Sequence, residues 1–207
     1  MGLDFRSNLQ PGQICKTLVC YTNENAEIWR SDQSDATGTQ GTFFRPIATP
    51  STAYKEARVL HSPKLEAYEE FPIVRAKQRP VILLAADAAL INLRPDHMKL
   101  DKHLCLVAPC YGIEDGMGIP KIQEPILERI RCLEFPQFFF LSHAAAMEKD
   151  SLLRLDSVFH TYRGHLEPTQ WQLSSEAWDI IRGQLEYILF GTIREKYKIA
   201  RQMLQGK

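Results

Sequence analysis

The sequence predicts a mainly β fold with α-helices at its C-terminus, built as a small, strongly curved sheet or barrel with the helices packed on one side or end. Two observations lead to this fold class. Apolar segments rich in β-branched and aromatic residues, bounded by Gly, Pro and polar residues, recur as far as about residue 162. From about residue 174 onward, the apolar residues instead recur at helical spacing. Strands followed by helices are typical of a sheet that helices cover on one side.

The predicted strands begin or end at turn signals. The first, over 9–21, contains the turn signal Pro11-Gly12. Within 72–86, the run VILLAA predicts a buried central strand, and Pro80 stands at its start, where no ladder donor is needed. The other strand-like segments are 102–112, 130–143 and 150–162.

Two segments between the predicted strands read as loops. Residues 22–55 are polar and rich in Gly, Ser and Thr, which predicts a long loop, with a strand near Trp29 or Phe43 as the alternative. The stretch YGIEDGMGIP, from Tyr111 onward, is rich in glycine and predicts a second loop. Its glycines lack the spacing of a phosphate-binding loop that opens a helix, so no nucleotide role is assigned to it.

The C-terminal region predicts two helices over about 174–205. Ser174 is a suitable N-cap, Glu176 favours the positive end of the first helix, and Gly191 is a suitable C-cap. The stretch TIREKYKIARQMLQGK predicts a second helix with alternating charges. One apolar face of the first helix is formed by Trp178, Ile181, Leu185, Ile188 and Leu189.

Composition bounds the class of protein. The 207 residues are 44% hydrophobic and 24% charged, with a net charge of zero, which is typical of a globular domain. A strongly basic nucleic-acid binder is therefore excluded for the chain as a whole, and affinity for phosphates needs a local patch. No run of about 18 apolar residues occurs and no secretory signal is evident, so no membrane partner and a cytoplasmic location are expected.

The five cysteines do not predict a disulfide framework or a metal site. Their number is odd, and the expected location is reducing. Cys105 and Cys110 stand in the strand-like CLVAPC, where an offset of five places the two thiols on opposite faces. Structural zinc sites space paired ligands by about two to four residues. We therefore expect neither a metal nor another cofactor.

The stretch SLLRLDSVFHTY contains candidate catalytic residues of the chain. If it is one strand, Leu153 and Leu155 share the core face, and Arg154 and Asp156 share the other face with His160. Arg154 and Asp156 then have Cα atoms about 6.6 Å apart, a span that fits one phosphate linkage. The pair is either a catalytic cation and anion or an ordinary surface ion pair of about 0.2–1 kcal/mol.

Four segments in order resemble the MazF/PemK/Kid family of toxin endoribonucleases. LQPGQIC resembles the opening strand of that family, KQRPVILLA its second-strand signature and CLVAPCYG the strand that usually ends in A-P-I-T-S. DSLLRLDSVFHTY, with the region through ILFG, resembles the closing stretch. The resemblance implies an SH3-like β-barrel of the PemK/CcdB type over 1–207, with an insertion at about 18–72, a second at about 112–130, and C-terminal helices. It also implies a homodimer, single-stranded RNA as substrate and a cognate antitoxin protein as partner.

The resemblance also implies roles for individual residues in metal-independent cleavage. Asp156 would be the general base and Arg154 the charge stabiliser or acid, while Arg79 would clamp the scissile phosphate. Tyr111 stands where the family has a hydroxyl residue that meets the substrate, and His160 is a candidate to replace a lost acid.

The chain departs from the family pattern, and the departures leave a second function open. Tyr111 extends farther from the backbone than the usual threonine, and no G-x-E-Q loop is recognisable. The alternative is a non-catalytic binding module on the same barrel, for protein or nucleic acid, that has lost cleavage. A third reading is a small-molecule site at Phe138-Phe139-Phe140, although consecutive aromatics are more typical of core or dimer interface.

Overall fold

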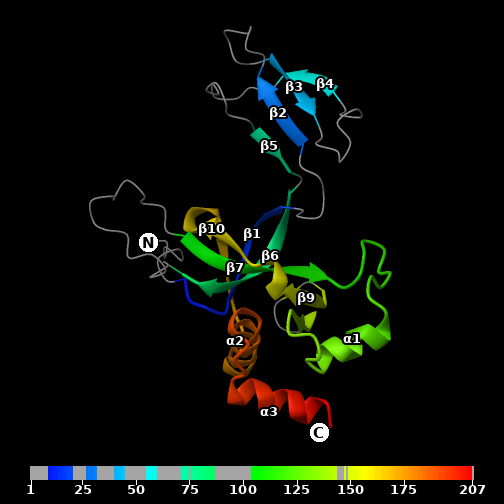
Figure 1. Ribbon diagram of the computed structural model, residues 1–207, viewed down its shortest axis with the longest axis vertical. Coiled ribbons are helices and arrows are strands. Elements are labelled where there is room, and N and C mark those ends of the chain that lie inside the picture. Colours follow the sequence, from blue (N-terminus) through cyan, green and yellow to red (C-terminus); the bar gives the residue numbers. More distant parts are fainter. Residues whose placement is uncertain are drawn as a thin grey trace, which may run out of the picture. The chain divides into compact units, whose positions relative to one another are not determined.

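The computed structural model describes residues 9–20, 27–31, 40–44, 55–59, 71–74, 76–86, 104–143, 147 and 149–206. The chain forms two compact units (Figure 1). The smaller unit is Val19–Lys77, and the larger comprises the residues up to Leu18 and those from Gln78 onward. The smaller unit spans nearly the residues of the insertion expected at about 18–72, and the structure separates them as a compact body of their own.

The larger unit is built on a seven-stranded sheet. Along its main path the strand order is β11-β1-β6-β7-β9-β8, and β10 also pairs with β7. The pairs with a described register are antiparallel. Together with the helices, this confirms the predicted fold class, a mainly β, barrel-like sheet with α-helices. The strands are β1 (Gln13–Cys20), β6 (Ala76–Ala85), β7 (Leu104–Gly112), β8 (Phe138–Leu141), β9 (Ser151–Arg154), β10 (Phe159–Tyr162) and β11 (Glu167–Gln172).

The strand β7 organises this sheet because β6, β9 and β10 all pair with it. The register with β6 begins at Val81, so Pro80 precedes the segment paired with β7. The register between β6 and β7 shifts between Leu83 and Ala85, which is the kind of irregularity that bends strands in curved sheets. Along β7, β10 pairs with Leu104–Val107, and β9 pairs with Cys110–Gly112.

Helices pack on two apolar clusters of the sheet. Trp178, Ile181 and Leu185 of α2 (Ser175–Phe190) pack on the main core, which includes Ile82, Ala108, Cys110, Leu153 and Leu155. Leu127 and Ile130 of α1 (Glu124–Arg131) form a second cluster with Leu152 and Ile113. Figure 1 shows α1 near β9, and α2 next to α3 (Glu195–Leu204). The glycine-rich loop predicted after Tyr111 is confirmed between the end of β7 at Gly112 and the start of α1 at Glu124. The strand predicted over 130–143 is wrong in its extent, because α1 continues to Arg131 and β8 begins only at Phe138.

The predicted ends of α2 are confirmed. The Ser174 hydroxyl accepts a hydrogen bond from the Ala177 amide at 3.2 Å, and Gly191 adopts a left-handed φ of 69°. The predicted apolar face is too long, because Ile188 and Leu189 are 38% and 66% exposed. The buried face of α2 therefore ends near Leu185, and the last turn projects beyond the core.

The smaller unit contains a sheet where the sequence predicted a long loop. Its four antiparallel strands have the order β4-β3-β2-β5. The alternative of strands near Trp29 and Phe43 is confirmed, because these two residues are directly paired between β2 and β3. The strands are β2 (Glu27–Ser31), β3 (Gln40–Phe44), β4 (Lys55–Val59) and β5 (Phe71–Ile73). In the described part of the chain, no helix has both the length and the apolar character needed to cross a membrane.

The contact between α2 and α3 depends on Gly183. A Cβ atom at this position would lie 2.5 Å from Cβ of Tyr197, which is fully buried. We expect Gly183→Ala to lower the free energy of unfolding by about 1–2 kcal/mol, because the steric cost exceeds the gain in helix propensity. Urea unfolding measures the change. The control is Gly164→Ala, where nothing lies within 4 Å and the change should stay within about 0.5 kcal/mol. Equal stability of the two variants would contradict the packing argument.

Candidate functional site

Three strands bring Arg79, Tyr111 and Arg154 to one face of the larger sheet. Val81 pairs with Pro109, so extending that register by two residues places Arg79 beside Tyr111. Tyr111 in turn pairs with Leu152, and Arg154 follows Leu152 by two residues on the same face. The alternation of strand side chains therefore aims two guanidinium groups at the Tyr111 ring.

The Tyr111 ring contacts both arginines. The guanidinium carbon of Arg79 lies 4.5 Å from the ring centroid, and that of Arg154 lies 5.8 Å from it. Arg154 also lies 5.9 Å from the centroid of Phe138, its direct partner between β9 and β8. The negative face of an aromatic ring attracts cations, with about 0.5–1 kcal/mol at exposed sites. Tyr111 is thus a shared platform that holds two positive charges close together.

Asp156 binds Arg154, although the two residues do not belong to one strand. The prediction of a continuous strand over 150–162 is wrong, because β9 ends at Arg154 and Leu155–Ser157 form a 3-10 turn. The core positions of Leu153 and Leu155 are confirmed. From the turn, the Asp156 carboxylate accepts hydrogen bonds from Arg154 Nε at 2.9 Å and Nη2 at 2.6 Å. The Ser157 hydroxyl donates a third at 3.3 Å.

This pair changes the acidity of both groups. Partial burial acts to raise the pKa of Asp156, but the hydrogen bonds and charge of Arg154 outweigh it, so the pKa lies below its usual value. The hydrogen bonds that Arg154 donates to the Asp156 carboxylate raise the pKa of Arg154 against the opposing effect of burial. The two side chains are 32% and 35% exposed, so both remain accessible to a ligand. Asp156 is therefore ionised and bound, and Arg154 stays protonated.

His160 is not placed with these residues. It lies on β10 opposite Leu106, which is five residues from Tyr111 along β7. Five residues correspond to about 16 Å along a strand and to the opposite face. The hypothesis that His160 joins Arg154 and Asp156 as a substituted acid is thus not supported by its position.

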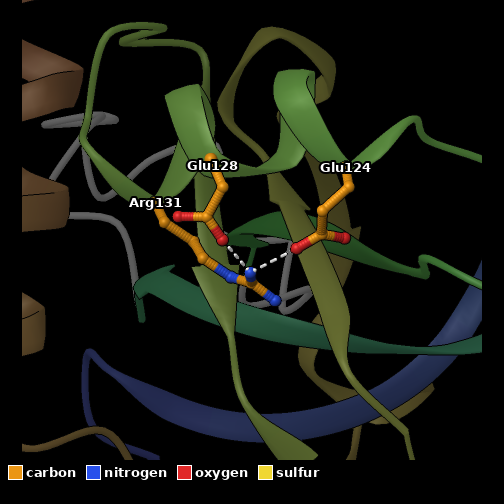
Figure 2. A network of polar contacts seen from close by, with 3 residues as sticks. All are labelled: Glu124, Glu128 and Arg131. Atoms are coloured by element: carbon orange, nitrogen blue, oxygen red, sulfur yellow. Dashed lines mark hydrogen bonds and ion pairs between the residues drawn. The ribbon is translucent and has the colours of Figure 1, made fainter.

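Beyond Phe138, the helix α1 borders the same face with a network of its own. Arg131 lies over the Phe140 ring, 4.6 Å from its centroid, and binds the carboxylates of Glu124 and Glu128 (Figure 2). Phe140 pairs with Leu152 and so shares the face of Arg154. Sequence reasoning missed this border, although the alternation of Phe138 and Phe140 beside Arg154 indicates an aromatic face. Because two carboxylates surround Arg131, this end of the face is not cationic.

Two of the buried cysteines, Cys15 and Cys110, are poorly suited to chemistry. Burial, with a smaller contribution from Cys105, raises the pKa of Cys15 to about 12, and burial also raises the pKa of Cys110. Thiols that stay protonated are poor nucleophiles and poor metal ligands. Within the described ranges, no group of three or more His, Cys, Asp or Glu side chains is arranged to hold a metal ion.

Comparison with known proteins gives no relative that assigns a function. No family model matches the chain, and no curated protein matches it. The site itself presents two guanidinium groups on one aromatic ring, with a carboxylate bound to one of them. Guanidinium groups of this kind recognise phosphates and carboxylates.

The role of the Tyr111 ring can be separated from that of its hydroxyl. Tyr111→Phe keeps the ring, so the ring-current shifts of the Arg79 and Arg154 Nε–Hε resonances should persist in NMR spectra. Tyr111→Leu should remove the contribution of this ring to both shifts, leaving Arg154 only the contribution of Phe138, and should cost about 1 kcal/mol more stability. The resonance of Arg129, which lies over Phe135, is the internal control and should not move. Unchanged Arg154 shifts in Tyr111→Leu would contradict the platform.

The ion pair with Arg154 should lower the pKa of Asp156 measured by titration. Because the folded-state pKa of Asp156 is lowered, the pair stabilises the fold fully above the unfolded value of about 3.9, and this contribution disappears as pH falls through the folded pKa. In Arg154→Gln, burial dominates and the pKa of Asp156 should rise. Carboxyl carbon NMR titration measures both values. An unchanged pKa in Arg154→Gln would show that Arg154 does not control Asp156.

Proposed function

We propose that the chain is a metal-independent endoribonuclease that cleaves single-stranded RNA through attack of a 2′-hydroxyl, as the resemblance to MazF/PemK/Kid toxins implies. The observation that carries the proposal is the shared Tyr111 platform, which places Arg79 and Arg154 close together beside Asp156. A phosphodiester needs cations on its oxygens, and its cleavage needs a base within reach of the neighbouring hydroxyl.

The proposed reaction uses each group once. Asp156 removes the proton from the 2′-hydroxyl, whose oxygen forms a bond to phosphorus while the bond from phosphorus to the 5′-oxygen breaks. Arg79 and Arg154 stabilise the charge on the non-bridging oxygens. The products are a 2′,3′-cyclic phosphate and a 5′-hydroxyl end, with the last proton supplied from solvent. The raised pKa of Arg154 favours charge stabilisation over proton donation for this residue.

A second candidate function is a non-catalytic binding module of PemK/CcdB type. The state of Asp156 favours it, because both carboxylate oxygens accept hydrogen bonds from Arg154. A carboxylate that accepts these hydrogen bonds is a weaker base than a free one, and the lowered pKa of Asp156 agrees with this. In this alternative, the two arginines still bind phosphates or acidic side chains, but no bond is broken.

The proposal includes the partners that such a toxin requires. These are an antitoxin protein, expected to be acidic so that it competes for the same arginines, and a second copy of the chain in a homodimer. A cytoplasmic location follows from the RNA substrate. The arginine cluster around Tyr111 supports an anionic partner without identifying it.

Cleavage of a long single-stranded RNA in the presence of EDTA tests the catalytic proposal. We expect cleavage by the wild-type chain and a loss of at least about 100-fold in Asp156→Ala and Arg154→Ala, the scale expected for removing a general base or a charge stabiliser. Arg79→Ala should lose activity through weaker phosphate binding.

Matched controls remove the same charges elsewhere in the larger unit. Arg129→Ala breaks the exposed pair with Glu134, and Asp179→Ala breaks the exposed pair with Lys196. Both should keep activity within about twofold, since such pairs contribute little. Cleavage that survives unchanged in Asp156→Ala and Arg154→Ala would contradict the assignment of catalysis to this site. A folded wild-type chain that binds RNA without cleaving it would favour the binding module.

A further inference from the structure

The phosphate-binding edge of Arg154 is already filled. Its Nε and Nη2 groups form parallel hydrogen bonds of 2.9 and 2.6 Å to the two oxygens of Asp156. This fork is the arrangement by which a guanidinium binds two oxygens of a phosphate. A phosphodiester and the Asp156 carboxylate cannot use the same two donors at once.

The contacts around the pair allow the Asp156 carboxylate to move away while the Arg154 guanidinium stays in place. Arg154 also contacts the rings of Tyr111 and Phe138, which keep it in place independently of Asp156. Asp156 belongs to the 3-10 turn rather than to the strand, so moving its side chain breaks no ladder hydrogen bond. The Ser157 hydroxyl, already 3.3 Å from Asp156 Oδ1, remains as a donor to the displaced carboxylate.

We propose that Asp156 is an internal competitor that occupies the phosphate site of Arg154 in the unliganded protein and that a phosphodiester of single-stranded nucleic acid displaces it. The inference rests on the phosphate site in the proposed function and not on cleavage itself. Displacement removes the cation from the carboxylate, so the binding of substrate is also the step that makes Asp156 a better base. The free protein thereby holds its base in an inactive state.

The competition can be measured with a ligand that cannot react. A short single-stranded oligodeoxynucleotide lacks the 2′-hydroxyl, and its affinity follows from fluorescence anisotropy at fixed low salt. Asp156→Asn should bind it about tenfold more tightly than the wild type, because the competing anion is gone while the side chain keeps its size. Asp179→Asn removes one charge from the exposed pair with Lys196 and should change the affinity by less than about twofold.

A double-mutant cycle separates competition at Arg154 from a general gain in positive charge. In the Arg154→Gln background, Asp156→Asn should increase affinity by less than about twofold, because the donor pair that it frees is absent. A gain of the same size in both backgrounds would overturn the proposal. So would an Asp156→Asn variant, folded by urea unfolding, that binds no more tightly than the wild type. Asp156→Ala serves as a second variant under the same criteria.

The outcome is distinguishable from failure of the proposed function. If the wild type does not cleave RNA in EDTA but Asp156→Asn binds more tightly only when Arg154 is present, the competitor stands and the ribonuclease does not. If the wild type cleaves RNA and Asp156→Asn shows no gain in affinity, the ribonuclease stands and the internal competitor is rejected.

Discussion

The pairing of β7 with β6, β9 and β10 is the constraint on which the larger unit depends. A strand that is paired on both sides cannot rotate, so its alternating side chains are committed to opposite faces. Ala108 and Cys110 therefore belong to the core that α2 covers, and Tyr111 must face the other way. Because β6 and β9 run beside this end of β7, the same constraint carries Arg79 and Arg154 to the Tyr111 ring. The candidate site is thus a consequence of strand register rather than of any interaction among its charged groups.

The register along β7 also explains why Asp156 leaves the sheet. Cys110 of β7 pairs with Leu153 of β9, and Val107 of β7 pairs with Phe159 of β10. Between these two pairs, β7 advances by three residues and the segment from β9 to β10 by six. Three residues of that segment are therefore in excess, and the 3-10 turn Leu155–Ser157 accommodates them. The turn keeps Leu155 in the core while Asp156 reaches the guanidinium of Arg154. A pair that is about one third exposed contributes only about 0.2–1 kcal/mol, so stability alone gives little reason for it.

Sequence patterns predicted the features that depend on local residue type, and they missed the features that depend on how strands pair. The caps at Ser174 and Gly191 and the buried strand after Pro80 followed from residue type alone. The break within 150–162 did not, because the excess residues exist only relative to β7. The exposure of Leu189 depends likewise on where the core ends, which helical periodicity cannot show. The helix α1 was missed for another reason: a short amphipathic segment behind a glycine-rich loop gives a weak signal, although Pro125 in its first turn favours a helix start. Arg79, Tyr111, Arg154 and Asp156 were each singled out from the sequence, but the ring that joins them was not.

The two arginine networks on this face differ in a way that decides where an anion can bind. Arg131 uses Nη1 for two carboxylates, Glu124 and Glu128, so a further anion would meet two negative charges (Figure 2). Arg154 holds one carboxylate through two of its five N–H groups. An incoming phosphate therefore has to displace a single anion from Arg154, one that is already a third exposed, and a second guanidinium, that of Arg79, lies over the same ring. The α1 network has two carboxylates for one guanidinium, so on this face the guanidinium groups meet at the Tyr111 end, and the chain's net charge of zero is compatible with this arrangement.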